Sequence, residues 1–487
     1  MTELFLEKTE FDCCFPGTAV CVPLENTVEC IVPDALPDVL EILRCVCTVT
    51  ECTKSADGDR VRVNASVEAC VLYRSEEGTR EVLRLSVPMQ AQAEGCADGR
   101  YTAEICLRRT ECTAPNSRKV SVRIFGELCV RPILQEKVAL PVVVPGTEGL
   151  EFDVREVSGA CIRDIVQREF SFAEELELPA SAPEAAAVLG ISAAARDVDC
   201  RIIPGKAVVK AVIDYRLWYL ADDGVRDALF SMPFSQILEF PAIGEGDTAR
   251  ISVSVAALSL REEEAGRIWS VTVSGSVCAA VFGTCSAAVI ADAYSTRDAV
   301  TAERGTRCLW RAGENAVREH EFREVLECGG RVISAAAEPL GILRGDGKLT
   351  AEISVILLTD GGEGTVPVTH RVSAEFPMEG ELLFPEVTVT EVTFVPASTG
   401  AEVRGRIRLH GTELCAEQVP VVEKLCSEGP RTEAHIPSVT LRRVAAGERY
   451  FDICRTYSAP LSELFAANGL EPTDRVEEAR MLIIPRK

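Results

Sequence analysis

One stretch of this sequence occurs twice at a constant spacing, and this internal repeat constrains the fold more than any other feature. Five residues in 24–80 reappear 146 positions later in 170–226: Pro33, Pro37, Leu43, Tyr73 and Gly78 recur as Pro179, Pro183, Leu189, Tyr219 and Gly224. A shared offset across four residue types indicates that one structural unit has been used twice. We therefore interpret the chain as an array of modules.

Within the repeat, apolar and polar residues alternate as they do in a β-strand that buries one face. The apolar positions are Val61, Val63, Ala65, Val67, Ala69 and Val71 in the first copy and Ala207, Val209, Ala211, Ile213, Tyr215 and Leu217 in the second. A third copy follows 140 positions after the second, with Leu349, Ala351, Ile353, Val355 and Leu357. Hairpin turns are expected at 75–78, 221–224 and 361–364, which are rich in glycine and acidic residues. The sequence thus predicts a mainly β protein built of three tandem β-sandwich-like modules.

The expected domains are module 1 with an N-terminal extension at 1–145, module 2 at 160–292, a divergent module 3 at 315–427 and a small domain at 437–487. Linkers are expected near 141–165, near 293–317 and at 427–433, a polar stretch with glycine and proline. A short helix is expected to open modules 1 and 2, because Pro37 fits a first helical turn and Asp38 favours its positive end.

Charge and composition exclude several classes of function. The 487 residues are 47% hydrophobic and 26% charged, as in folded proteins, and carry a net charge of −24. Nucleic acids and anionic membrane surfaces recruit clustered lysine and arginine, so neither is an expected partner. Residues 438–487 differ from the rest, since eight basic and seven acidic residues leave them near neutral. This difference indicates a separate domain with a separate role.

The N-terminal residues and the cysteines indicate a protein kept inside the cell. The first seven residues, Met1 to Glu7, lack a basic region and an apolar region, and no stretch is long enough to span a membrane. The 21 cysteines are odd in number and form no CxxC pair, and only four histidines occur, so we expect neither a disulfide framework nor a metal site. Reduced thiols in a β core are expected instead. The exception is the group Cys13, Cys14, Cys21 and Cys30, which is expected to cross-link if the protein meets an oxidant.

The last 50 residues change from strand alternation to a strand–helix–helix–strand pattern. Val439 to Val444 and Met481 to Pro485 are expected as strands, and the helix that begins at Leu461 is expected to end at Asn468 and Gly469. Because so small a domain has little stability to spare, Leu464→Ala and Ile483→Ala are both expected to unfold it while the modules remain folded.

This segment resembles a LysM domain, through Ala467-Asn468-Gly469-Leu470 and the final Leu482-Ile483-Ile484-Pro485. The resemblance implies a small βααβ domain with a groove that binds N-acetylglucosamine chains or a protein partner. Its loop, usually Gly-Asp-Thr-Leu-Trp, is here Gly447-Glu448-Arg449-Tyr450-Phe451, and Arg449 in place of a small threonine argues against glycan binding. One of Tyr450 and Phe451 is expected in the core and the other free for a partner. The candidate binding residues are Gly447, Glu448, Arg449, Tyr450, Phe451, Asn468 and Gly469.

The repeats resemble the SPOCS module of sporulation proteins, through 33–43 and through 203–211 with 220–224. Repeated SPOCS modules followed by one LysM domain are the arrangement of SipL-like spore-coat morphogenetic proteins. The resemblance implies a scaffold at the forespore surface in the mother-cell cytoplasm, whose LysM domain binds the coat-assembly ATPase.

No catalytic constellation is visible: the turn acids stand alone, and no nucleophile has a histidine in a known local pattern. Trp218 and Tyr219 are expected to pack within a strand. We therefore expect a protein without enzymatic activity or cofactors. Two alternatives stay open, namely a wall protein that binds peptidoglycan through the LysM-like domain, and a hydrolase that this domain targets.

Overall fold

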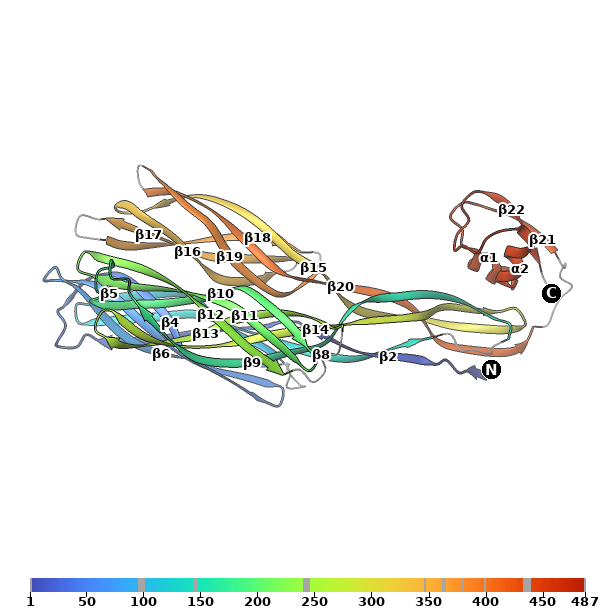
Figure 1. Cartoon of the computed structure of the whole chain (residues 1–487), viewed down its shortest axis with the longest axis horizontal. Coiled ribbons are helices and arrows are strands. Elements are labelled where there is room, and N and C mark those ends of the chain that lie inside the picture. Colours follow the sequence, from blue (N-terminus) through green and yellow to red (C-terminus); the bar gives the residue numbers. More distant parts are fainter. Residues whose placement is uncertain are drawn as a thin grey trace.

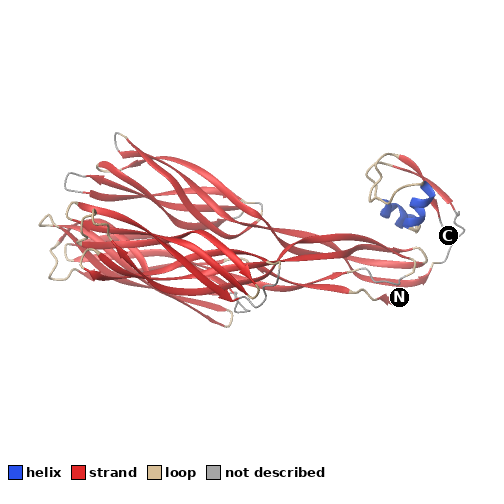
Figure 2. Cartoon of the chain, in the orientation of Figure 1, coloured by secondary structure: helices blue, strands red, loops and turns tan. Residues whose placement is uncertain are grey.

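The computed structural model describes residues 2–94, 101–142, 148–239, 246–345, 347–360, 365–378, 380–397, 400–431 and 439–485. Over these residues the prediction of a mainly β protein is confirmed, since 22 strands accompany two helices. Figure 1 shows a wide body of strands, a narrow extension of the body that we call the stalk, and a small domain beside the far end of the stalk that we call the tail (439–485). Both helices lie in the tail (Figure 2). The turn expected at 361–364 lies outside the described residues.

The chain from 20 to 430 forms three successive units of six strands each. Unit 1 contains β3 (Val20–Ile31), β4 (Val39–Asp57), β5 (Arg60–Ser75), β6 (Arg80–Glu94), β7 (Tyr101–Asn116) and β8 (Lys119–Pro141). Unit 2 contains β9 (Leu150–Glu177), β10 (Ala187–Ile203), β11 (Lys206–Ala221), β12 (Gly224–Glu239), β13 (Thr248–Glu264) and β14 (Ile268–Ser295). Unit 3 contains β15 (Asp298–Glu327), β16 (Arg331–Gly345), β17 (Lys348–Asp360), β18 (Thr365–Pro377), β19 (Glu381–Pro396) and β20 (Gly400–Pro430).

All three units share one pattern of strand pairing. The second, third and fourth strands pair in sequence, and the sixth strand pairs with both the first and the fifth, always antiparallel. One buried cluster in each unit draws residues from both resulting sheets, so the two sheets face each other across it. In β5 the alternate residues from Val61 to Val71 are buried in this cluster, as the alternation predicts.

The third strands of the three units also meet one another, on their opposite faces. Leu72, Trp218 and Leu358 occupy equivalent positions in β5, β11 and β17, and they share one buried cluster at 1%, 2% and 7% exposure. Because this hub draws on all three units, the units are parts of a common body rather than independent modules. The expectation that Trp218 packs within the strand layer agrees with its place here.

Polar contacts join each pair of units around the hub. Three hydrogen bonds illustrate them: Arg108 with Glu352 at 3.4 Å, Ser192 with Glu338 at 3.0 Å, and Arg84 with the carbonyl of Val188 at 2.5 Å. The guanidinium of Arg44 lies 5.0 Å from the ring centre of Trp218, and burial lowers its pKa to about 10. The three units are therefore held together by the apolar hub and by polar contacts around it.

The stalk forms where the first and last strands of each unit continue beyond the body. The strands β9 and β14 are 28 residues long, and β15 and β20 are 30 and 31. In unit 1 a separate strand, β2 (Lys8–Pro16), pairs with the end of β8, and β1 (Thr2–Leu4) pairs with the end of β20. The three ribbons share a core that includes Val138, Val157, Leu309 and Val421. Each ribbon thus buries the face that it could not bury alone.

Two local expectations are wrong. The linkers expected near 141–165 and 293–317 fall largely within β9 and β15, because these residues pair in the stalk. The helix expected at 33–43 is a turn followed by β4, which begins at Val39. Asp38 does not cap a helix: its carboxylate accepts hydrogen bonds from Ser117 at 2.8 Å and Arg118 at 3.0 Å, on the turn between β7 and β8. Of the third linker expected, at 427–433, residues 427–430 lie within β20, and residues 432–433 lie outside the described part of the chain.

The tail contains β21 (Val439–Val444), α1 (Tyr450–Tyr457), α2 (Leu461–Asn468) and β22 (Arg480–Pro485). The strands β21 and β22 form an antiparallel ribbon. Its inner face packs with both helices in a small core that includes Val444, Ile453, Leu464 and Leu482. One residue of the stalk, Tyr294 of β14, belongs to the same core, so the tail packs against the stalk.

Candidate functional site

Several of the residues expected to bind a partner also help to build the tail. Gly447 adopts a φ of +90° in the turn after β21, and Gly469 ends α2 with a φ of +61°. The carboxylate of Glu448 closes the same turn, because it accepts the backbone N–H of Ala445 at 2.7 Å. The amide of Asn468 bonds to Ile483 in both directions, at 2.7 Å each, and so fastens α2 to β22.

Tyr450 and Phe451 are both buried, at 3% and 5% exposure. Tyr450 packs edge-on against Phe465 inside the tail, with ring centres 5.1 Å apart. Phe451 packs edge-on against Tyr294 of β14, also with ring centres 5.1 Å apart. Both aromatic side chains belong to the same buried cluster, so the expectation that one of them is free for a partner is wrong.

Arg449 is the main polar contact between the tail and the stalk. Its guanidinium donates two hydrogen bonds to the carboxylate of Asp153 in β9, at 2.9 and 2.6 Å. The same guanidinium donates to Asp474, at 3.0 Å, in the segment between α2 and β22. Arg449 thus links both loops of the tail to one carboxylate of the stalk, in the two-bond geometry that arginine and carboxylates favour.

The stalk meets the tail with four side chains on one face of the β9–β14 ribbon. Asp153 lies directly opposite Asp292, and Glu151 lies directly opposite Tyr294. Both aspartates are only 7% exposed. Two like charges opposite each other in a sheet destabilise it unless cations neutralise them. Here Arg449 supplies one cation from the tail.

Two further arginines neutralise Asp292. Arg455 of α1 is hydrogen-bonded to its carboxylate, and Arg304 of β15 donates to it at 3.0 Å. Near them the hydroxyl of Tyr294 donates to the carbonyl of Ala459, between the two helices, at 2.8 Å. The carboxylate of Glu151 accepts the backbone N–H of Leu461 at the start of α2. The contact thus satisfies its buried polar groups from both sides.

The ionisation of this contact follows from its geometry. Burial alone would raise the pKa of Asp153, but the hydrogen bonds from Arg449 outweigh it and hold the pKa below its usual range. For Glu151 burial dominates and raises the pKa. The bonds to Asp153 raise the pKa of Arg449 further above its usual value. The pair Arg449–Asp153 is therefore fully ionised at neutral pH.

The outer face of the β21–β22 ribbon is apolar and exposed. Along both strands exposed and buried residues alternate, and Leu482 and Ile484 point inward at 0% exposure. Four side chains form the outer apolar face: Val439, Leu441, Met481 and Ile483, at 54%, 65%, 56% and 40% exposure. Leu441 and Ile483 are directly opposite each other. This face was not among the predicted binding residues, although the alternation from 439 to 444 was a signal for it.

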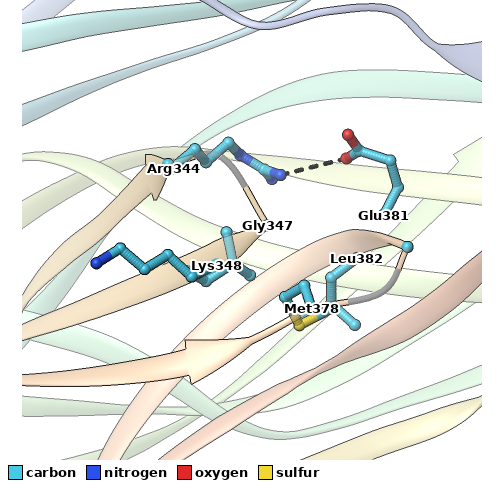
Figure 3. A pocket seen from close by; sticks show the side chains of 9 residues that line it. Arg344, Gly347, Lys348, Met378, Glu381 and Leu382 are labelled. Atoms are coloured by element: carbon cyan, nitrogen blue, oxygen red, sulfur yellow. Dashed lines mark hydrogen bonds and ion pairs between the residues drawn. The ribbon is translucent and has the colours of Figure 1, made fainter.

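Figure 3 shows a pocket of the body that is lined by residues next to the starts of β17 and β19. Its volume is about 120 Å³. Its labelled residues are Arg344, Gly347, Lys348, Met378, Glu381 and Leu382. Arg344 points at Glu381, 3.4 Å away, and Lys348 is paired with Glu375 at 2.5 Å. No serine, cysteine or histidine is among the described residues that line it, so this pocket contains no nucleophile–base pair of the kind hydrolases use.

Comparison of the chain with protein-family models, with curated proteins and with solved structures finds no match. Neither helix in the described part of the chain has the length and apolar character that crossing a bilayer requires.

Proposed function

We propose that this protein is a non-catalytic scaffold of the spore coat, in which three SPOCS-like units form the body and stalk and a LysM-like tail docks on the coat-assembly ATPase at the forespore surface. The order strand, helix, helix, strand in the tail and the common six-strand pattern of the units support this assignment. Proteins built from repeated units commonly serve as binding platforms.

The observation that carries the docking proposal is the exposed apolar face of the β21–β22 ribbon. Water-exposed clusters of large apolar side chains on a small domain mark surfaces that a protein partner covers. Arg443 lies on the same face, opposite Met481, so an apolar partner surface with a carboxylate fits best. The face stays open while the opposite side of the tail rests on the stalk.

The loop that resembles the glycan-binding loop favours a protein partner. Its Arg449 holds Asp153 of the stalk, and its Phe451 packs on Tyr294. A glycan chain at this loop would have to displace both contacts, including an ion pair whose carboxylate would be left buried. Peptidoglycan binding is therefore the alternative that the experiment below must distinguish from binding to a protein.

The test is a capture experiment with the full chain, using purified coat ATPase in one arm and insoluble peptidoglycan in the other. We expect capture by the ATPase alone. Leu441→Glu puts a charge on the apolar face, and a central interface residue of this kind should weaken capture by at least about tenfold. Val317→Glu is the matched control, because Val317 is an apolar residue of the body with 55% exposure.

Capture by peptidoglycan alone would contradict the proposed function and restore the wall-binding alternative. Capture by the ATPase that Leu441→Glu leaves unchanged would keep the scaffold and reject the ribbon as its docking face. In that case Arg449→Met, which frees the opposite face of the tail, should increase capture.

A further inference from the structure

Two cysteines of unit 1 face each other across neighbouring strands. Cys21 of β3 lies directly opposite Cys129 of β8, and their sulfur atoms are 2.8 Å apart. Residues directly opposite in antiparallel strands have Cα atoms about 4.5–5.5 Å apart. A disulfide accepts Cα separations of about 4.4–6.8 Å. The backbone therefore already has the spacing that a disulfide between these residues needs.

The other units show that this pairing is particular to unit 1. Their sixth strands also carry a cysteine opposite the first strand, Cys278 in β14 and Cys415 in β20. Cys278 is opposite Gln167, however, and Cys415 is opposite Arg311. Among the three equivalent places only the one in unit 1 brings two thiols together.

We propose that Cys21 and Cys129 form a disulfide when the protein meets a two-electron oxidant of the peroxide class. The thiolate of Cys21 attacks a peroxide oxygen, the O–O bond breaks, and Cys21 becomes a sulfenic acid as the first water leaves. The sulfur of Cys129 then attacks the sulfur of Cys21, the S–O bond breaks and the second water leaves. Two thiols and one hydrogen peroxide thus give one disulfide and two waters.

The exposure of the two thiols assigns their order of reaction. Cys21 is exposed, while Cys129 is partly covered. Burial raises the pKa of the Cys129 thiol, so Cys129 holds its proton more firmly and is the slower to meet an oxidant. In a reducing cytosol both thiols persist, and the bond closes only after transfer to an oxidising setting.

A metal ion is the competing occupant, since a carboxylate oxygen of Glu127 lies within 4.8 Å of both sulfurs. The geometry favours the disulfide. Two thiolates on one zinc ion are about 3.8 Å apart, from a Zn–S distance of about 2.3 Å in a tetrahedron, whereas here the sulfurs are 2.8 Å apart. Glu127 is also engaged already, because Arg108 donates to it at 2.9 Å.

The bond would join the first strand of unit 1 to its last. Cys21 and Cys129 are 108 positions apart, and β4 to β7 lie between them in the chain. A cross-link that closes so long a loop removes much of the freedom of the unfolded chain. The oxidised protein should therefore unfold at a temperature several degrees higher than the reduced protein, and a reductant should reverse the shift.

The test treats the reduced full chain with one equivalent of hydrogen peroxide, alkylates the remaining thiols and identifies disulfide-linked peptides by mass spectrometry without reduction. We expect a peptide pair joining Cys21 to Cys129, two hydrogen atoms lighter than the sum of the reduced peptides. Cys21→Ser and Cys129→Ser should each lose the pair and the thermal shift. Cys415→Ser, the equivalent cysteine of unit 3, should keep both.

Three results would overturn the proposal. One is full alkylation of Cys21 and Cys129 after peroxide treatment of a folded chain. Another is a cross-link from Cys129 to the neighbouring Cys106 in place of Cys21. The third is a stoichiometric zinc ion that dissociates on Cys21→Ser and that protects both thiols from peroxide.

Discussion

Replacing Arg449 by methionine should release the tail from the stalk. Methionine keeps the length of the apolar stem but removes both hydrogen bonds to Asp153. The side chain of Asp153 is 8% exposed and that of Arg449 is 17% exposed, so water screens the pair only weakly. The carboxylate of Asp153 would then stay buried opposite that of Asp292, with Arg155 at 3.7 Å as its nearest remaining cation.

The magnitude follows from the cost of leaving a buried charge without its partner, which is about 3–5 kcal/mol. About 1.4 kcal/mol corresponds to a tenfold change in an equilibrium constant. The equilibrium constant for docking of the tail on the stalk should therefore fall by at least about 100-fold. Asp153→Asn removes the charge together with its desolvation cost and should weaken docking less. The double variant should lose less than the sum of the two single variants, because both remove the same interaction.

Hydrogen exchange followed by mass spectrometry measures this docking at both surfaces. In the variant, protection should fall in peptides that cover 450–461 of the tail and 150–155 of β9, while peptides of the hub keep theirs. Arg443→Met is the matched control, since Arg443 is exposed on the outer face of the ribbon. Unchanged protection in Arg449→Met, or strictly additive effects in the double variant, would refute the reasoning that this ion pair holds the tail.

Three other expectations test the hub, the tail and the ionisation of their contact. Trp218→Ala should lower the free energy of unfolding by about 3–5 kcal/mol, and calorimetry should show one cooperative transition of the whole body rather than early loss of unit 2. Leu482→Ala, at a buried position, should unfold the tail, whereas Ile483→Ala should cost less than about 1 kcal/mol in circular dichroism melts. Docking of the tail on the stalk, measured by hydrogen exchange, should strengthen slightly as the pH falls from 7 to about 5. The reason is that burial in the docked form raises the pKa of Glu151, so its protonated form favours docking. Docking of the tail should then weaken below about pH 4, the ordinary pKa of an aspartate, and be lost as the pH falls through the lowered pKa that Asp153 has in the docked form.

The repeat and the alternation of residues predicted much of the fold. Val61 to Val71 face the core of their unit because a strand of period two has no other way to bury an apolar face. The hub was not predicted, although its signal is visible. Each third strand ends apolar on both faces, as in Leu217-Trp218-Tyr219-Leu220, which indicates a strand covered on both sides. The pattern predicts that both faces of these strand ends are buried, but it does not predict that the other two units bury the second face.

The errors have local physical causes. The helix expected at Pro37 and Asp38 depended on short-range preferences, and tertiary hydrogen bonds from Ser117 and Arg118 overrode them. In the tail the expectation for Ile483 was wrong by one residue, because the core face of β22 carries Leu482 and Ile484.

The candidate site was only partly accessible to sequence reasoning. Arg449 stood out because it departs from the LysM-like loop, but its partner Asp153 lies 296 positions away in another unit. β9 reaches the tail because this strand of 28 residues continues beyond the body into the stalk. The prediction that one of Tyr450 and Phe451 stays free for a partner is wrong, because both side chains are buried. Phe451 packs on Tyr294 of the stalk, and no local pattern identified that contact.

The long strands of the stalk also determine how the molecule carries a mechanical load. The tail follows β20, whose 31 residues run antiparallel to β15 and span about 100 Å at about 3.3 Å per residue. A pull on the tail acts along these strands and at right angles to their hydrogen bonds. The bonds of the ladder therefore resist together, in shear, and do not open one after another. A force applied to the tail would therefore be transmitted along the stalk to the whole body, and the stalk would not unfold strand by strand.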